Sequence, residues 1–492
     1  MIKQKIARLP NFAEALIIFF AVILGVSLSI IVIGIDTQVA LFYSLILSIM
    51  FAIYLGYSFN DVEKMMIKGL ENSSQMLLFN VFIGMIVSSW IAAGVIPYII
   101  YIGLSWFTPS LVAFWACLLC SIMSMLIGSS WTTGGTVGLA FVVIATTMGV
   151  PLPLIVGAVI TGSMFGDKQS PLSETTVFAA GTSKVKLMDH VSSMRYTSVP
   201  SLVVSLIIYA GVGFRFASTG YTDLSLIENI RSILAESFNF NPLILLLPIG
   251  LIILIVKKIN ALFCLAAAIV AGVIVAMLFQ DMSVYGISST LMTGMSVKSG
   301  SDIVDAICAK GGLNSMWFTI SIILLGFCMS EILASTRVYE TIVNRFSHKL
   351  TSAKSIIISS LLVGIILSIG TAAPYVPAMI TGACYFEIYN KYGIDRRVLS
   401  RTLEDGTTIP QAMVPWCASA MYFSTLFDCS VGAFLPYYLI GYLNPLMAVL
   451  CAVTGYGVMY TNHRKGWGKN KYSIEKDGII PLSVTEKYYE SI

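Results

Sequence analysis

The sequence predicts an all-α polytopic membrane protein, and composition and hydropathy lead to this fold class. Of its 492 residues, 57% are apolar and only 11% are charged, whereas soluble domains carry roughly 25% charged residues. Apolar runs such as 15–35 and 241–256 are candidates for helices that cross the hydrocarbon, which takes ~20 residues. Many such runs follow one another, so we expect about 10–13 membrane segments.

The apolar stretches place the expected helices along the chain. We expect spans at 12–35, 38–57, 76–104, 110–127, 197–216, 241–256, 260–279, 314–334, 354–370 and 431–460. Asn444-Pro445 should divide the last one into two short helices, because proline interrupts helical hydrogen bonding. The stretch 222–237 is expected to form an interfacial helix within the polar segment 217–240.

The loop charges predict an orientation. Lys and Arg cluster at 3–8, 64–68, 184–195, 257–258, 337–354, 391–401 and 464–471, and basic loops are typically cytoplasmic. The uncharged loops 105–110 and 147–152 should lie outside, as should the mixed-charge stretches 217–240 and 281–312. The net charge of +4 fits such loops rather than a nucleic-acid surface, and no nucleic-acid partner is expected.

Two halves of the chain share a pattern. A span ends at Gly128 and Asp167 follows 39 positions later; another ends at Gly370 and Asp405 follows 35 positions later. The flanking loops are uncharged in the first half and basic in the second. This predicts two inverted-topology repeats with broken or re-entrant helices, although chance similarity of Gly/Thr-rich segments is the alternative.

The repeats divide the chain into five regions. N-terminal helices (1–75) precede the first repeat (76–216), which has polar breaks at 128–138 and 166–176. Linking helices and polar loops (217–313) lead to the second repeat (314–460), with breaks at 370–382 and 403–416, and a cytoplasmic tail (461–492) follows.

The sequences GSSWTTGGTVG at 128–138 and GDKQSPLSETT at 166–176 are the most informative. Both are polar and Gly-rich inside an apolar chain. Backbone that leaves helical geometry at membrane depth persists only where it lines a cavity, and charged residues there mark function. We therefore expect the ion or substrate site of a transporter at these segments.

The acids of the first break fit a site shared by Na⁺ and protons. A buried carboxylate binds a cation or a proton, and the two compete, which favours Asp167 as the coupling residue. Lys168 is either part of the site or a structural partner that neutralises Asp167. Glu174 either faces the same cavity or marks the cytoplasmic end of the segment.

The second break carries two adjacent acids, Glu404 and Asp405. On a helix they would point about 100° apart. We expect Asp405 to face the cavity, because Gly406 and two threonines follow it, and its neighbour to meet Arg397 or Arg401 at the membrane surface.

The expected ion- or substrate-binding residues are the hydroxyl-bearing and charged side chains of these breaks. They are Ser129, Ser130, Thr132, Thr133, Thr136, Asp167, Lys168, Ser170, Ser173, Glu174, Thr175, Thr176, Thr371, Glu404, Asp405, Thr407 and Thr408. Oxygen ligands suit Na⁺, and we assign Asp167, Ser173, Thr176 and Asp405 as its ligands. The nine cysteines should be small buried hydrophobes, and His190, His348 and His463 should be solvated loop residues.

Three segments together resemble the NhaC family of Na⁺/H⁺ antiporters. They are GSSWTTGGTVG, the block PLPLIVGAVITGSMFGDKQSPLSETT at 151–176, and LSRTLEDGTTIPQAMVPW at 399–416. The resemblance covers roughly residues 10–460. It implies sodium-linked secondary transport in a bacterial inner (cytoplasmic) membrane, two inverted repeats, and a homodimer with an elevator-like motion.

The resemblance leaves the substrate open. The main expectation is Na⁺/H⁺ antiport, with the ions as coupling partners and no resident cofactor. The alternative is Na⁺-coupled carriage or exchange of a small organic substrate, an amino acid or a carboxylate such as malate or lactate, since Gly134–Gly135 would open extra space. The sequence contains no HExxH or GxSxG motif, so we do not expect an enzyme. The paired breaks favour a transporter with alternating access over a channel.

Overall fold

The computed structural model describes residues 7–217, 224–257, 259–301, 304–305, 308–309, 311–347, 352–371 and 375–461. This described part is helical, with one isolated β-bridge between Ile394 and Tyr460. Six helices are long and apolar enough to cross a membrane, or eight if each of two sharply bent helix pairs is counted as one span. The all-α polytopic fold class is confirmed, and the repeat symmetry stays a prediction.

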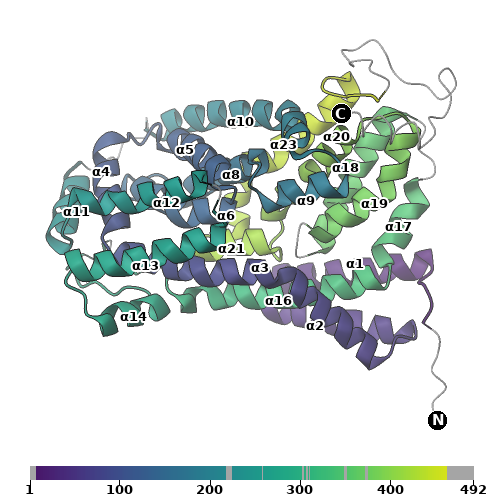
Figure 1. The fold of residues 1–492 in the computed structure, drawn as a ribbon, viewed down its shortest axis with the longest axis horizontal. Helices are drawn as coiled ribbons and strands as arrows, with labels where there is room; N and C mark the ends of the chain where they lie inside the picture. The colour runs from purple at the N-terminus through teal and green to yellow at the C-terminus, as the bar shows by residue number, and fades with distance from the viewer. Residues whose placement is uncertain are drawn as a thin grey trace.

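The long helices form two neighbouring groups along the longest axis of the molecule (Figure 1). The lower group contains α1 (Phe12–Leu28), α2 (Thr37–Tyr54), α3 (Phe59–Ala92), α13 (Ala261–Phe279) and α16 (Trp317–Ser335). The upper group contains α5 (Val112–Ile127), α8 (Leu152–Gln169), α10 (Leu187–Ala217) and α23 (Leu439–Thr454).

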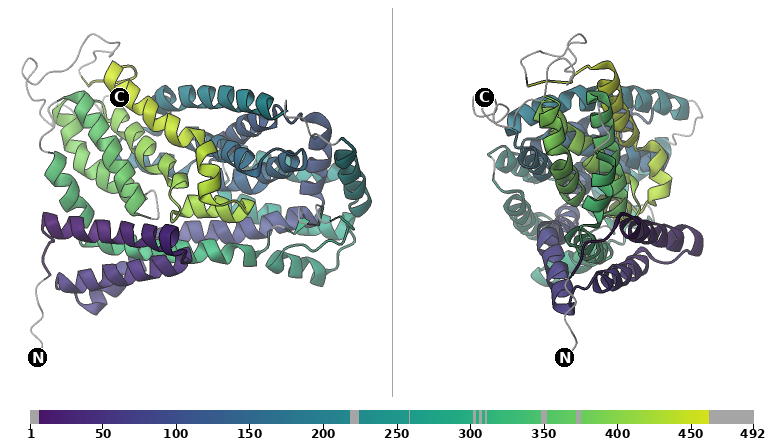
Figure 2. Two further views of the ribbon diagram at one scale, coloured as in Figure 1. Left: turned by 180° about the vertical axis from the view of Figure 1, so that it is seen from behind. Right: turned by 90° about the vertical axis from the view of Figure 1, so that its right-hand side faces the viewer.

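A third set of helices covers the end of the upper group that is furthest from α4 and α11 (Figures 1 and 2). These are α18 (Ala353–Gly370), α19 (Tyr375–Lys391) and α20 (Arg396–Leu403), next to α17 (Val338–Ser347). At the opposite end lie α4 (Val95–Trp106), α11 (Leu224–Ser237), α12 (Leu246–Val256) and α14 (Val284–Thr293).

Short elements fill the middle of the molecule, where the polar segments lie. They are α6 (Ser130–Thr133), η2 (Gly134–Gly138), α7 (Leu139–Thr147), α9 (Glu174–Thr182), η5 (Glu404–Thr408), η6 (Ile409–Met413) and α21 (Ala418–Phe427). The remaining turns are η1 (Ser29–Ile33), η3 (Pro242–Leu245), η4 (Leu313–Met316), α22 (Val431–Phe434) and η7 (Leu435–Tyr437). Both η2 and η5 are π-helical turns.

Several predicted boundaries are wrong. The expected span 76–104 is two helices, because Gly94 takes φ 77° between α3 and α4. Asn444-Pro445 does not divide α23, because this helix continues through Pro445. The chain bends before α23 begins, where α22 and η7 turn by 94° from the preceding helices. The polar stretch 281–312 contains α14, and the helix expected within 222–237 is present as α11.

Glycine permits close packing of α5 against α8, and this packing places the site. Gly162 and Gly166 lie one turn apart on α8, and a Cβ at either position would collide with a carbonyl of Cys117 or Ser121 on α5. Small residues at this spacing allow membrane helices to touch through their backbones. The contact fixes the C-terminal end of α8, which carries Asp167, beside the end of α5.

The cysteines agree with the sequence, but one histidine does not. All nine cysteines are free, and eight of them are buried. His190 is fully buried on α10 and meets Ser400 at 2.9 Å, so the expectation of a solvated loop residue is wrong. His348 and His463 lie outside the described residues.

Candidate functional site

The polar segments leave helical geometry far less than expected. In 128–138 only Gly128 and Ser129 are non-helical, and α6 continues directly into the π turn η2. In 166–176 the helix α8 runs through Gln169, so only 170–173 is non-helical. A continuous helix satisfies the hydrogen bonds of its own backbone groups, which hydrocarbon cannot do. The departure from regular α-helix is confined to the π turns.

The second half behaves similarly. Thr371 is non-helical, residues 372–374 are outside the described part, and α19 begins at Tyr375. The stretch 403–416 stays helical through η5 and η6 as far as Met413. Among the described residues, the predicted breaks are therefore short turns, or, from 403 to Met413, continuous helical turns.

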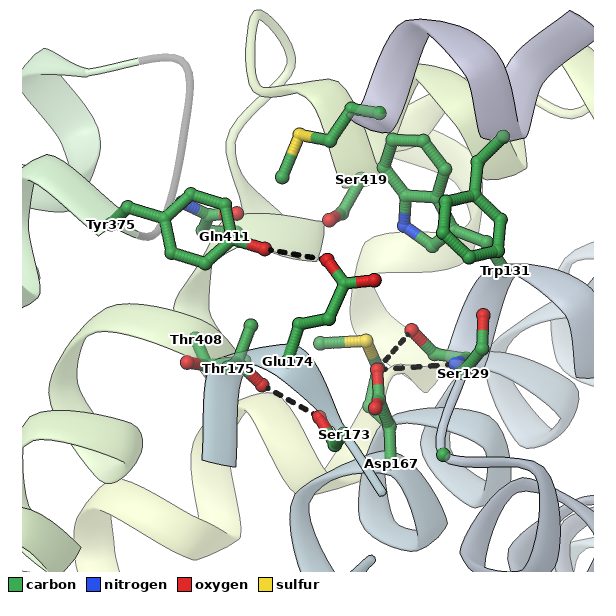
Figure 3. A pocket seen from close by; sticks show the side chains of 15 residues that line it. Ser129, Trp131, Asp167, Ser173, Glu174, Thr175, Tyr375, Thr408, Gln411 and Ser419 are labelled. Atoms are coloured by element: carbon green, nitrogen blue, oxygen red, sulfur yellow. Dashed lines mark hydrogen bonds between the residues drawn. The ribbon is translucent and has the colours of Figure 1, made fainter. Parts of the chain in front are cut away.

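These turns surround a pocket of about 570 Å³, a volume that includes its open mouth. Figure 3 shows side chains from both halves of the chain converging on it. The lining consists of Met76, Phe79, Gly128, Ser129, Ser130, Trp131, Met164, Asp167, Ser173, Glu174, Thr175, Tyr375, Thr408, Gln411 and Ser419. Two carboxylates, Asp167 and Glu174, are among the residues that line this cavity.

Asp167 lies at one side of the pocket, held by Ser130. The Ser130 backbone N–H and hydroxyl both donate to Asp167 Oδ2, at 3.1 and 2.7 Å. Gly128 takes φ 74°, and a Cβ there would collide with the backbone at Leu172. This close approach brings α6 against the turn that follows α8, and so fixes the Ser130 donors beside the carboxylate.

Glu174 is the second carboxylate and begins α9. Its side chain points into the pocket between Tyr375 and Trp131 (Figure 3). Gln75 of α3 donates to one carboxylate oxygen, and the Tyr375 hydroxyl donates to the other at 3.3 Å. Glu174 therefore faces the cavity, the first of the two alternatives that the sequence left open.

One wall of the pocket is aromatic and is held by ring stacking and a hydrogen bond. Trp131 stacks on Tyr422 with ring centroids 4.8 Å apart and an angle of 9° between the planes. The Tyr422 hydroxyl donates to the Trp131 carbonyl at 2.7 Å. This pair joins α6 to α21 across the two halves of the chain.

Lys168 does not neutralise Asp167. Its ammonium forms a fully buried ion pair with Asp405. The same Asp405 oxygen accepts from the Thr197 hydroxyl at 3.1 Å and from Asn444 Nδ2 at 2.7 Å. Asp405 is not among the residues that line the pocket, so the expectation that it faces the cavity is wrong.

Glu404 has a different environment from the other acids. It is 1% exposed, and neither carboxylate oxygen has a hydrogen-bond partner in the described chain. The expected contact with Arg397 or Arg401 is therefore absent. Arg401 is also buried, and it donates from Nη1 to the Gly457 carbonyl at 3.0 Å.

The structure brings some of the predicted site residues together and separates others. Those that line the pocket are Ser129, Ser130, Asp167, Ser173, Glu174, Thr175 and Thr408. Those outside its lining are Thr132, Thr133, Thr136, Lys168, Ser170, Thr176, Thr371, Glu404, Asp405 and Thr407. Of the four assigned Na⁺ ligands, only Asp167 and Ser173 lie in the pocket, and their role in binding stays a prediction.

Most of the excluded hydroxyls bond within their own segment. Thr133 and Thr136 donate to backbone carbonyls one turn earlier, Thr407 donates to Leu403, and Thr176 donates to the Lys168 carbonyl at 3.2 Å. Hydroxyls in membrane helices commonly do so. Their presence in a polar sequence therefore did not show that they face a cavity.

The sequence did not point to several residues that build the pocket. These are Gln75, Met76, Phe79, Trp131, Met164, Tyr375, Gln411 and Ser419. Gln75 offered a weak signal, since an amide within a long helix needs a polar partner. The apolar residues offered none, because core packing uses the same side chains.

A polytopic helical fold with carboxylates in a polar cavity between its two halves is typical of membrane transporters. The model of the Na⁺/H⁺ antiporter family matches residues 162–456 of the chain. The chain is 34% identical to the malate-2H⁺/Na⁺-lactate antiporter of Bacillus subtilis, over 94% of this chain and 98% of that protein. It is 30% identical to the Na⁺/H⁺ antiporter NhaC of Alkalihalophilus pseudofirmus, over 90% and 97% of the two chains.

A third relative is the arginine/ornithine antiporter ArcD of Halobacterium salinarum, which is 32% identical over 91% of this chain and 93% of that protein. The chain belongs to the Na⁺/H⁺ antiporter family. This confirms the resemblance found in the sequence and supports Na⁺/H⁺ antiport as its function. The family consists of transporters, which agrees with the expectation that the chain is not an enzyme.

Proposed function

We propose that the chain exchanges Na⁺ for protons through the pocket between Asp167 and Glu174. The observation that carries this proposal is the charge of the lining: two carboxylates and no basic side chain. The neighbouring Lys168 is bound to Asp405 and does not neutralise either acid. The pocket is therefore a site for a cation.

The other lining groups are suitable for Na⁺. Ser129, Ser173, Thr175 and Thr408 offer hydroxyl oxygens, and Gln411 offers an amide oxygen. Na⁺ prefers such hard oxygen ligands. Asp167 and Glu174 would hold the ion by charge, and the neutral oxygens would complete its shell.

The substitution Asp167→Asn tests this proposal. It removes the charge and keeps the size of the side chain. In proteoliposomes with an imposed Na⁺ gradient, the wild type should move protons against the direction of Na⁺, and Asp167→Asn should not. The matched control is Asp36→Asn, an exposed acid between α1 and α2, which should transport as the wild type does. Unchanged transport by Asp167→Asn would show that the cation site lies elsewhere.

We also propose that the two halves are inverted repeats that alternate access to this pocket. Gly128 and Gly370 end α5 and α18, and the π turns η2 and η5 lie in the polar segment of each half. The opposite loop charges support the opposite insertion. A cysteine placed in 337–347 should react only from the cytoplasmic side; reaction from outside would reject the repeat.

A small organic substrate is the second candidate, and the pocket favours one with an amino group. Trp131 and Tyr375 flank the pocket, and its lining offers amide and hydroxyl groups beside the two carboxylates. Two carboxylates would attract an ammonium group and repel a dicarboxylate. Gln411 Nε2, which has no partner in the described chain, would donate to the carboxylate of an amino acid.

Counterflow of labelled ornithine and of labelled malate separates these substrates. Accumulation of ornithine in vesicles preloaded with amino acid would support the organic cation. Accumulation of malate alone would reject this interpretation of the pocket's charge.

We place the protein in a bacterial inner membrane as a homodimer. Cross-linking in native membrane vesicles tests both the location and the dimer.

A further inference from the structure

We propose that Gln75 is a further cation ligand at the edge of the pocket, and that its amide changes from donor to ligand when the cation binds. This inference rests on the proposed exchange of Na⁺ for protons, because it takes Glu174 as one of the acids that hold the cation. Gln75 belongs to α3, and Glu174 begins α9. The hydrogen bond between their side chains is the observation that carries the proposal.

Gln75 lies at the edge of the pocket and not in its lining. It is exposed, whereas Glu174 lines the pocket and is half-buried. Met76 and Phe79 of the same helix line the pocket with apolar groups. Gln75 therefore gives α3 a polar contact with the pocket, at a position that solvent reaches.

The carboxylate of Glu174 accepts hydrogen bonds from two helices. Gln75 Nε2 donates to Oε1, and the Tyr375 hydroxyl of α19 donates to Oε2 at 3.3 Å (Figure 3 shows the second bond). A carboxylate oxygen can only accept, so an amide beside it has to present its NH₂ group. The carbonyl oxygen of Gln75 makes no hydrogen bond with a described residue, so it is available to a ligand.

A cation at Glu174 changes which end of the amide is favoured. Na⁺ prefers hard oxygen ligands, and the NH₂ group of an amide has no acceptor to offer it. Rotation about the last side-chain torsion exchanges the amide nitrogen and oxygen, and this torsion is broad and roughly two-fold. The exchange therefore needs no movement of α3, and it turns the Gln75 carbonyl oxygen toward the ion that Glu174 holds.

This ligand would make the cation a link between the two neighbouring groups of helices. In the lower group, α3 packs against α13 and α16 (Figure 1), whereas Asp167 lies on α8 of the upper group. In the structure, Gln75 joins α3 to Glu174 directly. With Na⁺ bound, the link passes through the ion, so the set of ligands is complete only while α3 lies against the pocket.

Two substitutions of similar size separate a ligand from a donor. Gln75→Glu keeps an oxygen and loses the NH₂ group, and Gln75→Met loses both. Gln75→Met should weaken Na⁺ binding about fivefold, the usual effect of one lost polar contact. Gln75→Glu should bind Na⁺ more tightly than the wild type, because a charged oxygen replaces a neutral one.

Calorimetric titration of the purified full chain with NaCl gives the dissociation constants. It is carried out at alkaline pH, where carboxylates are ionised, with choline chloride to keep the ionic strength constant. Because Gln75 is exposed, neither substitution opens a cavity in the core.

Ser74 provides the matched control. It is the neighbouring exposed residue of α3, and its hydroxyl donates to the Glu71 carbonyl at 2.8 Å. Ser74→Glu adds the same charge without placing it beside Glu174, and it should keep the wild-type affinity, since salt screens exposed charges. A gain in Na⁺ affinity in Ser74→Glu as large as that in Gln75→Glu would overturn the proposal, because the added charge alone would explain both.

Two further results would contradict the proposal. Weaker Na⁺ binding in both Gln75→Glu and Gln75→Met would mean that Gln75 acts only as a donor that positions Glu174. Wild-type affinity in Gln75→Met would mean that Gln75 does not contact the cation. Absence of Na⁺ binding in the wild type would instead reject the proposed function, so the two failures are distinguishable.

Discussion

The buried ion pair between Lys168 and Asp405 provides a prediction whose size follows from its geometry. Both side chains are completely inaccessible to solvent. Lys168→Met keeps the length of the side chain and removes its charge, which leaves Asp405 buried with only Thr197 and Asn444 as donors. Breaking one partner of a buried pair typically costs about 3–5 kcal/mol.

We expect a cost at the lower end of this range, at about 3 kcal/mol. The reason is that the hydrogen bonds from Thr197 and Asn444 to Asp405 remain. The double variant with Lys168→Met and Asp405→Asn leaves no buried charge behind, so it should lie within about 1–2 kcal/mol of the wild type.

Unfolding of the four proteins in mixed detergent and SDS micelles, followed by fluorescence, gives the required free energies. The two single variants should be destabilised by far more than the double variant, with a coupling of at least about 3 kcal/mol. Additive effects would refute the reasoning, because they would mean that Lys168 and Asp405 do not compensate each other in the folded protein.

The remaining predictions concern the ligands and the packing. Ser173→Ala removes a pocket hydroxyl and should weaken Na⁺ binding by about 1 kcal/mol, or roughly fivefold, in calorimetric titration of the purified protein with NaCl. Thr176→Ala should leave Na⁺ affinity unchanged, since that hydroxyl bonds to the Lys168 carbonyl outside the pocket. An equal loss of Na⁺ affinity in Ser173→Ala and Thr176→Ala would contradict the boundaries of the pocket. Gly162→Ala should destabilise the protein or prevent its folding, because the new methyl group would collide with the Cys117 carbonyl, and a wild-type melting temperature would show that the two helices are less closely packed.

The sequence predicted the all-α fold class, and its polar segments lead to the pocket, because both depend on local composition. Runs of apolar residues require helices in a membrane, and polar residues among them mark a cavity. Asp167, Ser173 and Glu174 were named in this way; they line the pocket, and their role in binding stays a prediction. The same reasoning overestimated the breaks, because Gly, Ser and Thr at 128–138 are compatible with a π turn as well as with a loop.

Pairings between distant segments could not be predicted. Lys168 and Asp405 are 237 positions apart, and the sequence placed Lys168 beside Asp167 simply because they are neighbours. His190 likewise follows basic residues and suggested a loop, whereas the structure buries it against Ser400 of α20. The boundary at Gly94 was missed because the residues on both sides are apolar, so hydropathy alone shows one continuous span.

We propose that Na⁺ and protons move in opposite directions through one acidic pocket. The most direct test of this claim records radioactive sodium uptake and internal pH together, in vesicles that contain the wild-type protein and no other gradient than Na⁺. Proton efflux should accompany sodium uptake, and both should disappear in Asp167→Asn at equal protein content. Sodium uptake with a labelled amino acid and no proton movement would contradict the claim and establish the organic substrate instead.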